Sequence, residues 1–252
     1  KKVLILGCGA LGSWAAEIVA RANPNTVHLL DNSIIKPGVL TRQNYQLDDI
    51  ASNKAAALAK RLRAIASNVS IEHFDRETHA FLTEDVSRFG SYDVILDCTA
   101  SAIFQMKLER DWGIFGGHTP CVISMVIDAK AQYCLCAVLS QNSRGGIWDA
   151  YLQLKCRLSL DGRRQGIASA FYSERAARDL FQPEPGCSDP TFSGSTADVF
   201  SLVSTALNLS VSQCTNGNTP VGIVFSTHNQ DGRSGSLDVF KLSMAEETIA
   251  GQ

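Results

Sequence analysis

Long apolar runs and an excess of one charge are both absent from this sequence of 252 residues. The longest apolar-looking stretch, Val199 to Val211, is interrupted by serines, a threonine and an asparagine, and it is too short to span a bilayer. The formal net charge is −2, so neither a nucleic acid nor an anionic membrane surface is indicated as a partner. These absences, with 45% hydrophobic and 19% charged residues, predict a soluble globular protein.

Three familiar motifs are also missing. No G-x-x-x-x-G-K-[ST] sequence is present, which argues against a P-loop enzyme, and no Gly-x-Ser-x-Gly elbow is present. The sequence has no Cys-x-x-Cys pair, and the nearest approach, Cys134-x-Cys136, lacks a second pair with zinc spacing. The five histidines show no spacing typical of a catalytic dyad or a metal site. The sequence therefore predicts no zinc site.

Little in the sequence suggests disulfide bonds. The eight cysteines are scattered, and several lie inside apolar runs, so we expect free thiols in a reducing cytoplasm. The sequence starts at Lys1 without an initiating methionine or a cleavable signal and enters an apolar run at once. We therefore expect either a domain of a larger protein or a chain that lacks its first residues.

What is present is an alternation of short apolar runs and helical stretches. Strands are predicted at 2–6, 27–30, 69–73, 92–98 and 121–127, and helices at 11–22, 53–66 and 102–112. This order is typical of an α/β fold with a Rossmann-like, doubly wound, mostly parallel sheet. Further strands at 133–139, 221–227 and 237–242 and helices at 146–158 and 197–214 follow, with a polar turn at 161–166. We expect a single domain over 1–252, with a nucleotide-binding half of about 1–130 and a substrate half of about 131–252.

A glycine-rich loop marks the nucleotide site. Gly7-Cys8-Gly9-Ala10-Leu11-Gly12 fits G-x-G-x-x-G between a predicted strand and a helix, and Asp31 ends the next strand. The glycines permit a tight turn and the close approach of a phosphate to the helix N-terminus, and Asp31 can accept hydrogen bonds from a ribose. The loop predicts nucleotide binding but does not choose among NAD, FAD and ATP.

Three charged residues favour ATP. A triphosphate carries about four negative charges, which cations must offset where charge builds on the leaving pyrophosphate. Arg42 can bind two phosphate oxygens at once, and Lys54 can act as a point charge. Asp97 ends a central strand, where doubly wound folds bind ligands, and a carboxylate there can hold Mg²⁺. Each residue also has a plainer interpretation: a solvated loop cation, an exposed first-turn lysine and the cap of a turn, respectively.

These motifs, in this order, resemble the ThiF superfamily, which includes the adenylating subunits of ubiquitin-activating enzymes and the bacterial activators of sulfur-carrier proteins. The resemblance covers about residues 1–130. It is carried by Gly7-x-Gly9-x-x-Gly12-Ser13, Asp31, Arg42-Gln43, Asn53-Lys54-Ala55 and Asp97-Cys98-Thr99. It implies an ATP- and Mg²⁺-dependent attack by the C-terminal carboxylate of a ubiquitin-like or other partner protein on the α-phosphate, which gives an acyl-adenylate and pyrophosphate.

The resemblance also implies roles for individual residues. Asp31 would bind the ribose, Arg42 and Lys54 the phosphates and Asp97 the Mg²⁺, with Gln43 and Asn53 as supporting polar groups. A homodimer is a further implication. The sequence departs from the family pattern at Val39, where an asparagine usually stands three residues before the arginine.

Cys187 is the candidate nucleophile for a thioester step. Its Pro- and Gly-rich surroundings predict an exposed loop just before a helix near Thr196, and a helix N-terminus lowers the pKa of a thiol. Pro185-Gly186-Cys187-Ser188-x-Pro190-Thr191-Phe192 resembles the activating domains of bacterial anti-phage conjugation systems such as CBASS, which implies antiviral defence. Against this role, Asp189 would raise the thiol pKa, and Cys187 is alternatively a loop thiol without a function. The other cysteines are predicted to be structural, with Cys8 inside the glycine loop and Cys98 in a buried strand. The remaining five are predicted to lie in the core: Cys121, Cys134, Cys136, Cys156 and Cys214.

Two other functions remain open at this point. An NAD-dependent oxidoreductase would use the same first half but would not need Arg42, Lys54 and Asp97 together. A non-catalytic pseudo-activator would bind a partner through the same surface and would not exchange pyrophosphate into ATP.

Overall fold

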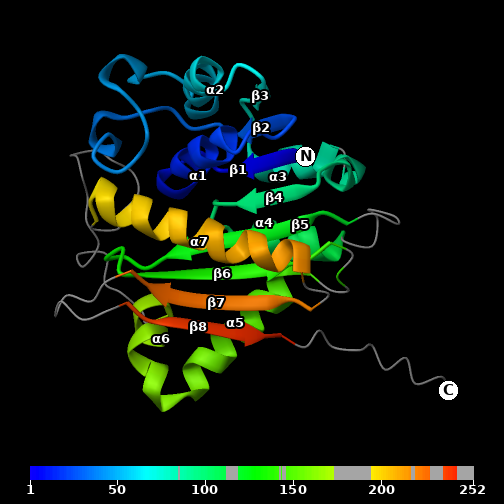
Figure 1. The fold of residues 1–252 in the computed structure, drawn as a ribbon, viewed down its shortest axis with the longest axis vertical. Helices are drawn as coiled ribbons and strands as arrows, with labels where there is room; N and C mark the ends of the chain where they lie inside the picture. The colour runs from blue at the N-terminus through cyan, green and yellow to red at the C-terminus, as the bar shows by residue number, and fades with distance from the viewer. Residues whose placement is uncertain are drawn as a thin grey trace.

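A mixed eight-stranded sheet runs through the protein and carries helices on both faces (Figure 1). The computed structural model describes residues 1–84, 86–111, 119–141, 143, 146–172, 194–216, 219–227 and 235–242. The strands follow the order β3-β2-β1-β4-β5-β6-β7-β8 across the sheet. They are β1 (Lys2–Leu6), β2 (Thr26–Leu30), β3 (Ser70–Phe74), β4 (Val94–Asp97), β5 (Cys121–Ile127), β6 (Tyr133–Leu139), β7 (Val221–Ser226) and β8 (Leu237–Lys241).

The sheet has a parallel half and an antiparallel half. The strands from β3 to β5 pair in parallel, whereas β6, β7 and β8 each run antiparallel to their neighbours. The central strands β1 and β2 are buried almost throughout, as parallel strands covered on both faces must be. This architecture confirms the predicted Rossmann-like fold with additional strands in the C-terminal half.

Two layers of helices cover the sheet. α1 (Ala10–Arg21), α2 (Lys54–Ile65) and α7 (Thr196–Asn216) pack on one face, and α7 crosses in front of β5 and β6 in Figure 1. The opposite face carries α3 (Thr78–Glu84), α4 (Ala102–Arg110), α5 (Ile147–Leu160) and α6 (Gln165–Tyr172). Alternate residues of β1 serve the two layers: Val3 and Ile5 face the first, and Leu4 and Leu6 face the second.

The helix boundaries show which local signals the sequence carries. Asn53 caps α2 by accepting a hydrogen bond from the amide of Ala56 at 2.9 Å, as its residue type predicts. In contrast, α6 begins at Gln165, inside the segment predicted as a polar turn. The turn was thus predicted two residues too long and the helix was missed, because α6 is stabilised by packing of Ala168 against Leu154 and Leu158 of α5 rather than by a strong local signal.

The cysteines require two corrections. Cys121, at the start of β5, and Cys214, near the end of α7, are joined by a disulfide bond, so the prediction of free thiols was wrong for this pair. The two residues are 93 positions apart, and only the path of α7 across the sheet brings them together. Cys156 was predicted to lie in the core, but it is exposed on α5. Cys134 and Cys136 are free and buried, as predicted, and Cys8 in the glycine loop is also free and buried.

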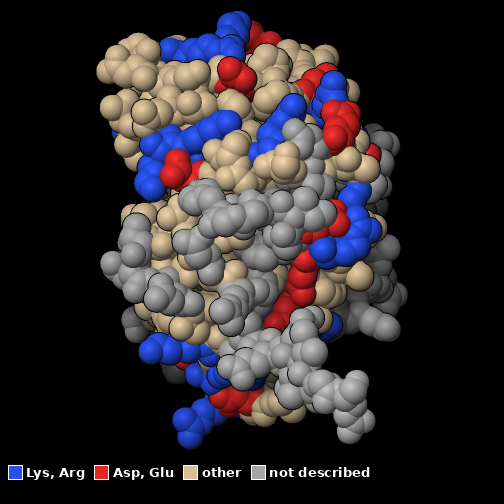
Figure 2. Space-filling model, turned by 90° about the vertical axis from the view of Figure 1, so that its right-hand side faces the viewer, with Lys and Arg blue, Asp and Glu red and all other residues tan. Residues whose placement is uncertain are grey.

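The surface carries charges of both signs. On the face shown in Figure 2, basic and acidic side chains are interspersed over the described residues. No helix of the described residues has both the length and the apolar character that crossing a membrane requires.

Candidate nucleotide-binding site

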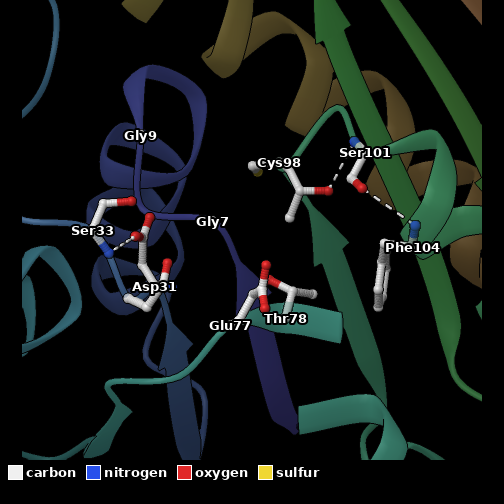
Figure 3. Close-up of a pocket in the computed structure, with 11 residues that line it drawn as sticks. Gly7, Gly9, Asp31, Ser33, Glu77, Thr78, Cys98, Ser101 and Phe104 are labelled. Carbon is white, nitrogen blue, oxygen red and sulfur yellow. Dashed lines mark hydrogen bonds between the residues drawn. The ribbon is translucent and has the colours of Figure 1, made fainter. Parts of the chain in front are cut away.

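A cavity of about 320 Å³ lies at the carboxyl edge of the parallel half of the sheet (Figure 3). The glycine loop after β1, the segments after β2 and β3 and the turn after β4 meet there, so four parallel strands lead into its walls. Ligands of doubly wound folds bind at this edge. The lining residues are Gly7, Gly9, Asp31, Asn32, Ser33, Glu77, Thr78, Cys98, Thr99, Ser101 and Phe104.

Each of the three glycines of the loop is needed for a different structural reason. Gly7 has φ +80°, and an added Cβ would lie 3.1 Å from the carbonyl oxygen of Cys98. A Cβ on Gly12 would lie 1.8 Å from the carbonyl oxygen of Gly7, so any side chain there would displace the loop. A Cβ on Gly9, in contrast, would meet no protein atom within 4 Å. Gly9 therefore borders open space at the N-terminus of α1, where a phosphate can approach the backbone.

Asp31 lies in the cavity wall and keeps part of its hydrogen-bonding capacity for a ligand. One carboxylate oxygen accepts from the amide of Cys8 and the other from the amide of Ser33, each at 2.7 Å. A carboxylate has about four acceptor positions, so two remain. This arrangement fits the predicted ribose contact.

The segment around Arg42 is fastened to α1. The indole nitrogen of Trp14 donates to the carbonyl oxygen of Arg42 at 3.0 Å, and the amide of Asn44 donates to the hydroxyl of Ser13 at 3.1 Å. The side chain of Asn44 donates to Glu17 at 2.6 Å. Burial alone would raise the pKa of Glu17, but hydrogen bonds from Asn44 and two arginines outweigh it and lower this pKa. Glu17 therefore remains ionised and holds the segment.

Tyr45 connects the same segment to the glycine loop and to α2. Its hydroxyl donates to the carbonyl oxygen of Cys8 at 2.7 Å and lies 3.3 Å from that of Lys54. Burial raises the pKa of Tyr45 far above its ordinary value, so the hydroxyl keeps the proton that it donates. Because of this residue, the Arg42 segment, the glycine loop and the start of α2 form one rigid unit.

The predicted phosphate ligands lie around this unit rather than in the cavity wall. Arg42 is only 3% exposed, and Gln43 is half-buried with its Oε1 atom lacking a hydrogen-bond partner among the described residues. Lys54 is half-buried at the first position of α2. Burial and the charge of Asp31 raise the pKa of Cys8, and the charge of Lys54 lowers it in part.

Asn53 and Asp97 have structural partners in this arrangement. Asn53 donates to the carbonyl oxygen of Asp31 at 2.9 Å, so it supports the wall of the site. Asp97 is fully buried, and its Oδ1 accepts from the amide and the hydroxyl of Thr99 at 3.0 and 2.6 Å. Its Oδ2 accepts from Gln105 at 3.0 Å and from Ser124 at 2.9 Å.

Asp97 as arranged here does not fit a Mg²⁺ ligand. Its two oxygens already accept four hydrogen bonds from protein donors, and the side chain has no exposed surface. A carboxylate that binds Mg²⁺ needs at least one oxygen directed at the ion. Among the described residues, no group of three or more His, Cys, Asp or Glu side chains is placed to hold a metal ion.

Several residues of the site carry no sequence signal that the motifs could reveal. Trp14, Tyr45 and Ser124 contact backbone or side chains that are distant in sequence, so no local motif marks them. Of the supporting residues, Ser13 and Thr99 belong to the motifs. Cys187 lies outside the described residues, so its place in the site stays a prediction. The cysteines near the cavity are poor nucleophiles, because burial raises the pKa of Cys8 and of Cys98.

Comparison with known proteins agrees with this geometry. Residues 1–222 match the model of the ThiF family. The chain belongs to the ThiF family. This membership confirms the resemblance seen in the motifs and extends it beyond the nucleotide-binding half.

Two curated relatives of this ThiF-family chain match less than half of its length. An ATP-dependent ubiquitin transferase-like protein Cap2 from Enterobacter hormaechei is 35% identical over 116 residues, which are 44% of this chain and 19% of that protein. A sulfur carrier protein ThiS adenylyltransferase from Bacillus subtilis is 38% identical over 101 residues, which are 39% of this chain and 28% of that protein. The chain thus matches less than a third of either relative's length.

Solved structures of the same fold cover nearly the whole chain. The crystal structure of Escherichia coli MccB with ATP aligns with 98% of this chain and 65% of that one, at a TM-score of 0.56 and 16% identity. The crystal structure of PaaA aligns with 94% and 72%, at a TM-score of 0.57 and 20% identity. At these identities the likeness concerns the fold, including the antiparallel half of the sheet.

Proposed function

We propose that this ThiF-family chain binds ATP and transfers AMP to the C-terminal carboxylate of a ubiquitin-like or other partner protein. The observation that carries the proposal is the cavity beside Gly9, which is open to a phosphate on one side and bordered by Asp31 on the other. The matched Cap2 and ThiS adenylyltransferase proteins support the choice of a protein carboxylate as the acceptor of AMP.

Each part of the site has a task in this reaction. The backbone at Gly9 and the N-terminus of α1 hold a phosphate, and Asp31 orients the ribose. Arg42 and Lys54 offset the charge that develops on the leaving pyrophosphate, which is where fixed cations contribute most. The bonds from Trp14 and Tyr45 hold the backbone of Arg42 and of Lys54 against α1 and the glycine loop. None of these contacts requires Mg²⁺ at Asp97, which does not fit that role as arranged.

The partner's carboxylate would enter from the antiparallel half. A second cavity of about 420 Å³ lies between α7 and the β7–β8 pair, and Ser226 and Thr227 line it at the carboxyl end of β7. Since β7 runs in the same direction as β5 and β1, this cavity opens at the same edge of the sheet as the nucleotide cavity. An extended C-terminal segment lying there would direct its carboxylate towards the α-phosphate.

Cys187 would then accept the acyl group. Its thiolate would attack the acyl carbon of the adenylate, form a thioester and release AMP. Cys187 precedes Thr196 by nine residues, and a chain of that length spans at most about 32 Å. The hydroxyl of Thr196 donates to the carbonyl oxygen of Thr41 at 2.7 Å, and Thr41 directly precedes Arg42. The maximum span of about 32 Å therefore starts close to Arg42. The chain length between Cys187 and Thr196 is therefore compatible with the proposed attack.

Pyrophosphate exchange tests the adenylation step. The chain should exchange labelled pyrophosphate into ATP when a cognate ubiquitin-like protein is present, and NAD should not raise its melting temperature. Lys54→Ala should slow exchange by about 2–4 kcal/mol of activation free energy, the usual contribution of one charge-stabilising group. Lys60→Ala on the exposed side of the same helix is the matched control and should exchange at the parent rate. Equal rates in both variants would place the phosphate site elsewhere.

A non-reducing gel tests the thioester step. With ATP and the partner protein, the parent should give a thiol-sensitive adduct, and Cys187→Ala should abolish it while exchange continues. Cys156→Ala removes the exposed thiol of α5 and should leave the adduct intact. An adduct that survives Cys187→Ala and disappears in another cysteine variant would show that the acceptor is a different residue.

A further inference from the structure

Asp97 starts a series of hydrogen bonds that continues into the wall of the nucleotide cavity. Thr99, held by Asp97, accepts on its hydroxyl from the amide of Ser101 at 3.1 Å. The hydroxyl of Ser101 in turn accepts from the amide of Phe104 at 3.2 Å and caps α4. Thr99, Ser101 and Phe104 all line the cavity, and Figure 3 shows the bonds made by Ser101. Asp97 itself lies behind this wall.

A second set of bonds returns to the same carboxylate from α4 and β5. Gln105, directly after Phe104, donates through Nε2 to Asp97 at 3.0 Å and to the hydroxyl of Ser124 at 2.8 Å. Ser124 donates its own proton to Asp97. One buried side chain therefore joins β4, the first turns of α4 and the middle of β5.

The turn that this network holds also supports the glycine loop. The Cβ position of Gly7 lies 3.1 Å from the carbonyl oxygen of Cys98 and 3.3 Å from the amide nitrogen of Thr99, so the loop rests directly on this backbone. Between Thr99 and Ser101, Ala100 has φ +53°, a left-handed conformation that costs an alanine free energy. The hydrogen bonds on both sides of Ala100 keep the turn in this shape.

We propose that Asp97 is a positioning residue for the nucleotide, which it serves by fixing the wall from Thr99 to Phe104 and the support beneath Gly7, and that it does so without a metal ion. The proposal rests on the proposed function, because it assumes that the nucleotide occupies this cavity. It differs from the metal role implied by the family resemblance, since Asp97 acts here through Thr99 and Ser101.

Calorimetric titration with ATP, once in EDTA and once in excess Mg²⁺, separates the two roles. For a positioning residue, Asp97→Asn should weaken ATP binding about tenfold, and by the same factor in both buffers. A loss confined to the Mg²⁺ buffer, with unchanged affinity in EDTA, would overturn the proposal and restore the metal role.

Variants of Thr99 test the same series without touching Asp97, and they decide the question where Asp97→Asn does not fold. Thr99→Val keeps the shape of the side chain but removes its hydroxyl, and should weaken ATP binding about tenfold in both buffers, whereas Thr99→Ser should restore the parent affinity.

Ser124→Ala is the control, because it removes a bond to Asp97 on the side away from the cavity. It should lower the melting temperature but leave ATP affinity within about twofold of the parent. An equal loss of affinity in Ser124→Ala and Thr99→Val would mean general loosening and would overturn the proposal.

Hydrogen–deuterium exchange keeps this test independent of the proposed function. In Thr99→Val, peptides covering residues 97–104 should exchange faster than in the parent without any nucleotide, and Thr99→Ser should match the parent. Unchanged exchange in Thr99→Val would show that the series does not hold the wall. A parent chain that binds no ATP but shows this pattern would instead refute the proposed function and leave the role of Asp97 in the wall intact.

Discussion

Asp31 and Asp97 lie at the same edge of the sheet, at the ends of the two strands that flank β1, yet one side chain lines the cavity and the other is buried beneath α4. In the register of the parallel strands, Leu6 of β1 pairs with Leu30 of β2 on one side and with Asp97 of β4 on the other. Asp97 is thus the last residue of its strand, whereas Asp31 is the first residue beyond its strand. That offset of one residue leaves Asp97 between the sheet and α4, where it is fully buried, and turns Asp31 into the cavity wall.

The number of donors around each carboxylate follows from this difference. Asp97 accepts four hydrogen bonds from its own fold, and Asp31 accepts two from backbone amides. A buried carboxylate must be fully satisfied, while a carboxylate in a cavity wall can leave acceptor positions for a ligand. The comparison therefore assigns Asp97 chiefly to the fold and Asp31 chiefly to the ligand.

Removing the buried carboxylate should have the largest effect. Asp97→Ala leaves the donors of Gln105, Ser124 and Thr99 without their acceptor, and each buried unsatisfied group costs about 1–3 kcal/mol. We expect the free energy of unfolding, measured by urea denaturation, to fall by about 3 kcal/mol. Asp48→Ala, at an exposed position, should change it by no more than about 0.5 kcal/mol. A loss below about 1 kcal/mol in Asp97→Ala would contradict the assignment of Asp97 to the fold.

The matching change at the cavity wall should affect binding more than stability. Asp31→Asn keeps one oxygen acceptor but loses the charge, and a hydrogen bond to a charged group contributes about 1.5–3 kcal/mol. ATP affinity measured by calorimetry should therefore fall roughly tenfold or more, while the free energy of unfolding changes by less than in Asp97→Ala. If the variant binds ATP as well as the parent does, the ribose is not held by Asp31.

Glu17 offers a third carboxylate, and the smallest expected effect. Its pKa is lowered in the folded chain, so its contribution to stability is present above the unfolded value of about 4.3 and is lost as the pH falls through the folded value. The unfolding free energy of the parent should decline below about pH 5, and Glu17→Gln should show a shallower decline over the same range. Urea denaturation between pH 3 and pH 6, with Asp48→Asn as the control, checks this. Identical pH profiles for parent and Glu17→Gln would show that Glu17 adds nothing to the attachment of the Arg42 segment.

The sequence predicted the parts of the fold that local patterns encode. Short apolar runs marked β1, β2 and the strands of the C-terminal half, and Asn53 marked the start of α2. The glycine motif placed Gly7 and Asp31 together, because the carboxyl ends of parallel strands meet at one edge.

Other parts depend on contacts that no local pattern records. The disulfide between Cys121 and Cys214 exists because α7 packs across β5. The bond from Trp14 to Arg42 exists because α1 packs against the segment that follows β2. The surroundings of Asp97 have the same origin. A motif shows that a carboxylate ends a strand, but the donors of α4 and β5 decide where that carboxylate points.

Gly9 has a consequence for genetics. Alanine at Gly12 would collide with the carbonyl oxygen of Gly7, and alanine at Gly7 would combine a strained φ of +80° with a tight contact of 3.1 Å, so we expect both alleles to destabilise the fold as well as the site. At Gly9 the added methyl group meets no protein atom within 4 Å and takes its volume from the ligand alone. An allele carrying Gly9→Ala would therefore leave the protein abundant in the cell and able to meet its other partners, while depriving it of nucleotide. Such an allele separates the functions that need only the folded protein from those that need its nucleotide-dependent catalysis.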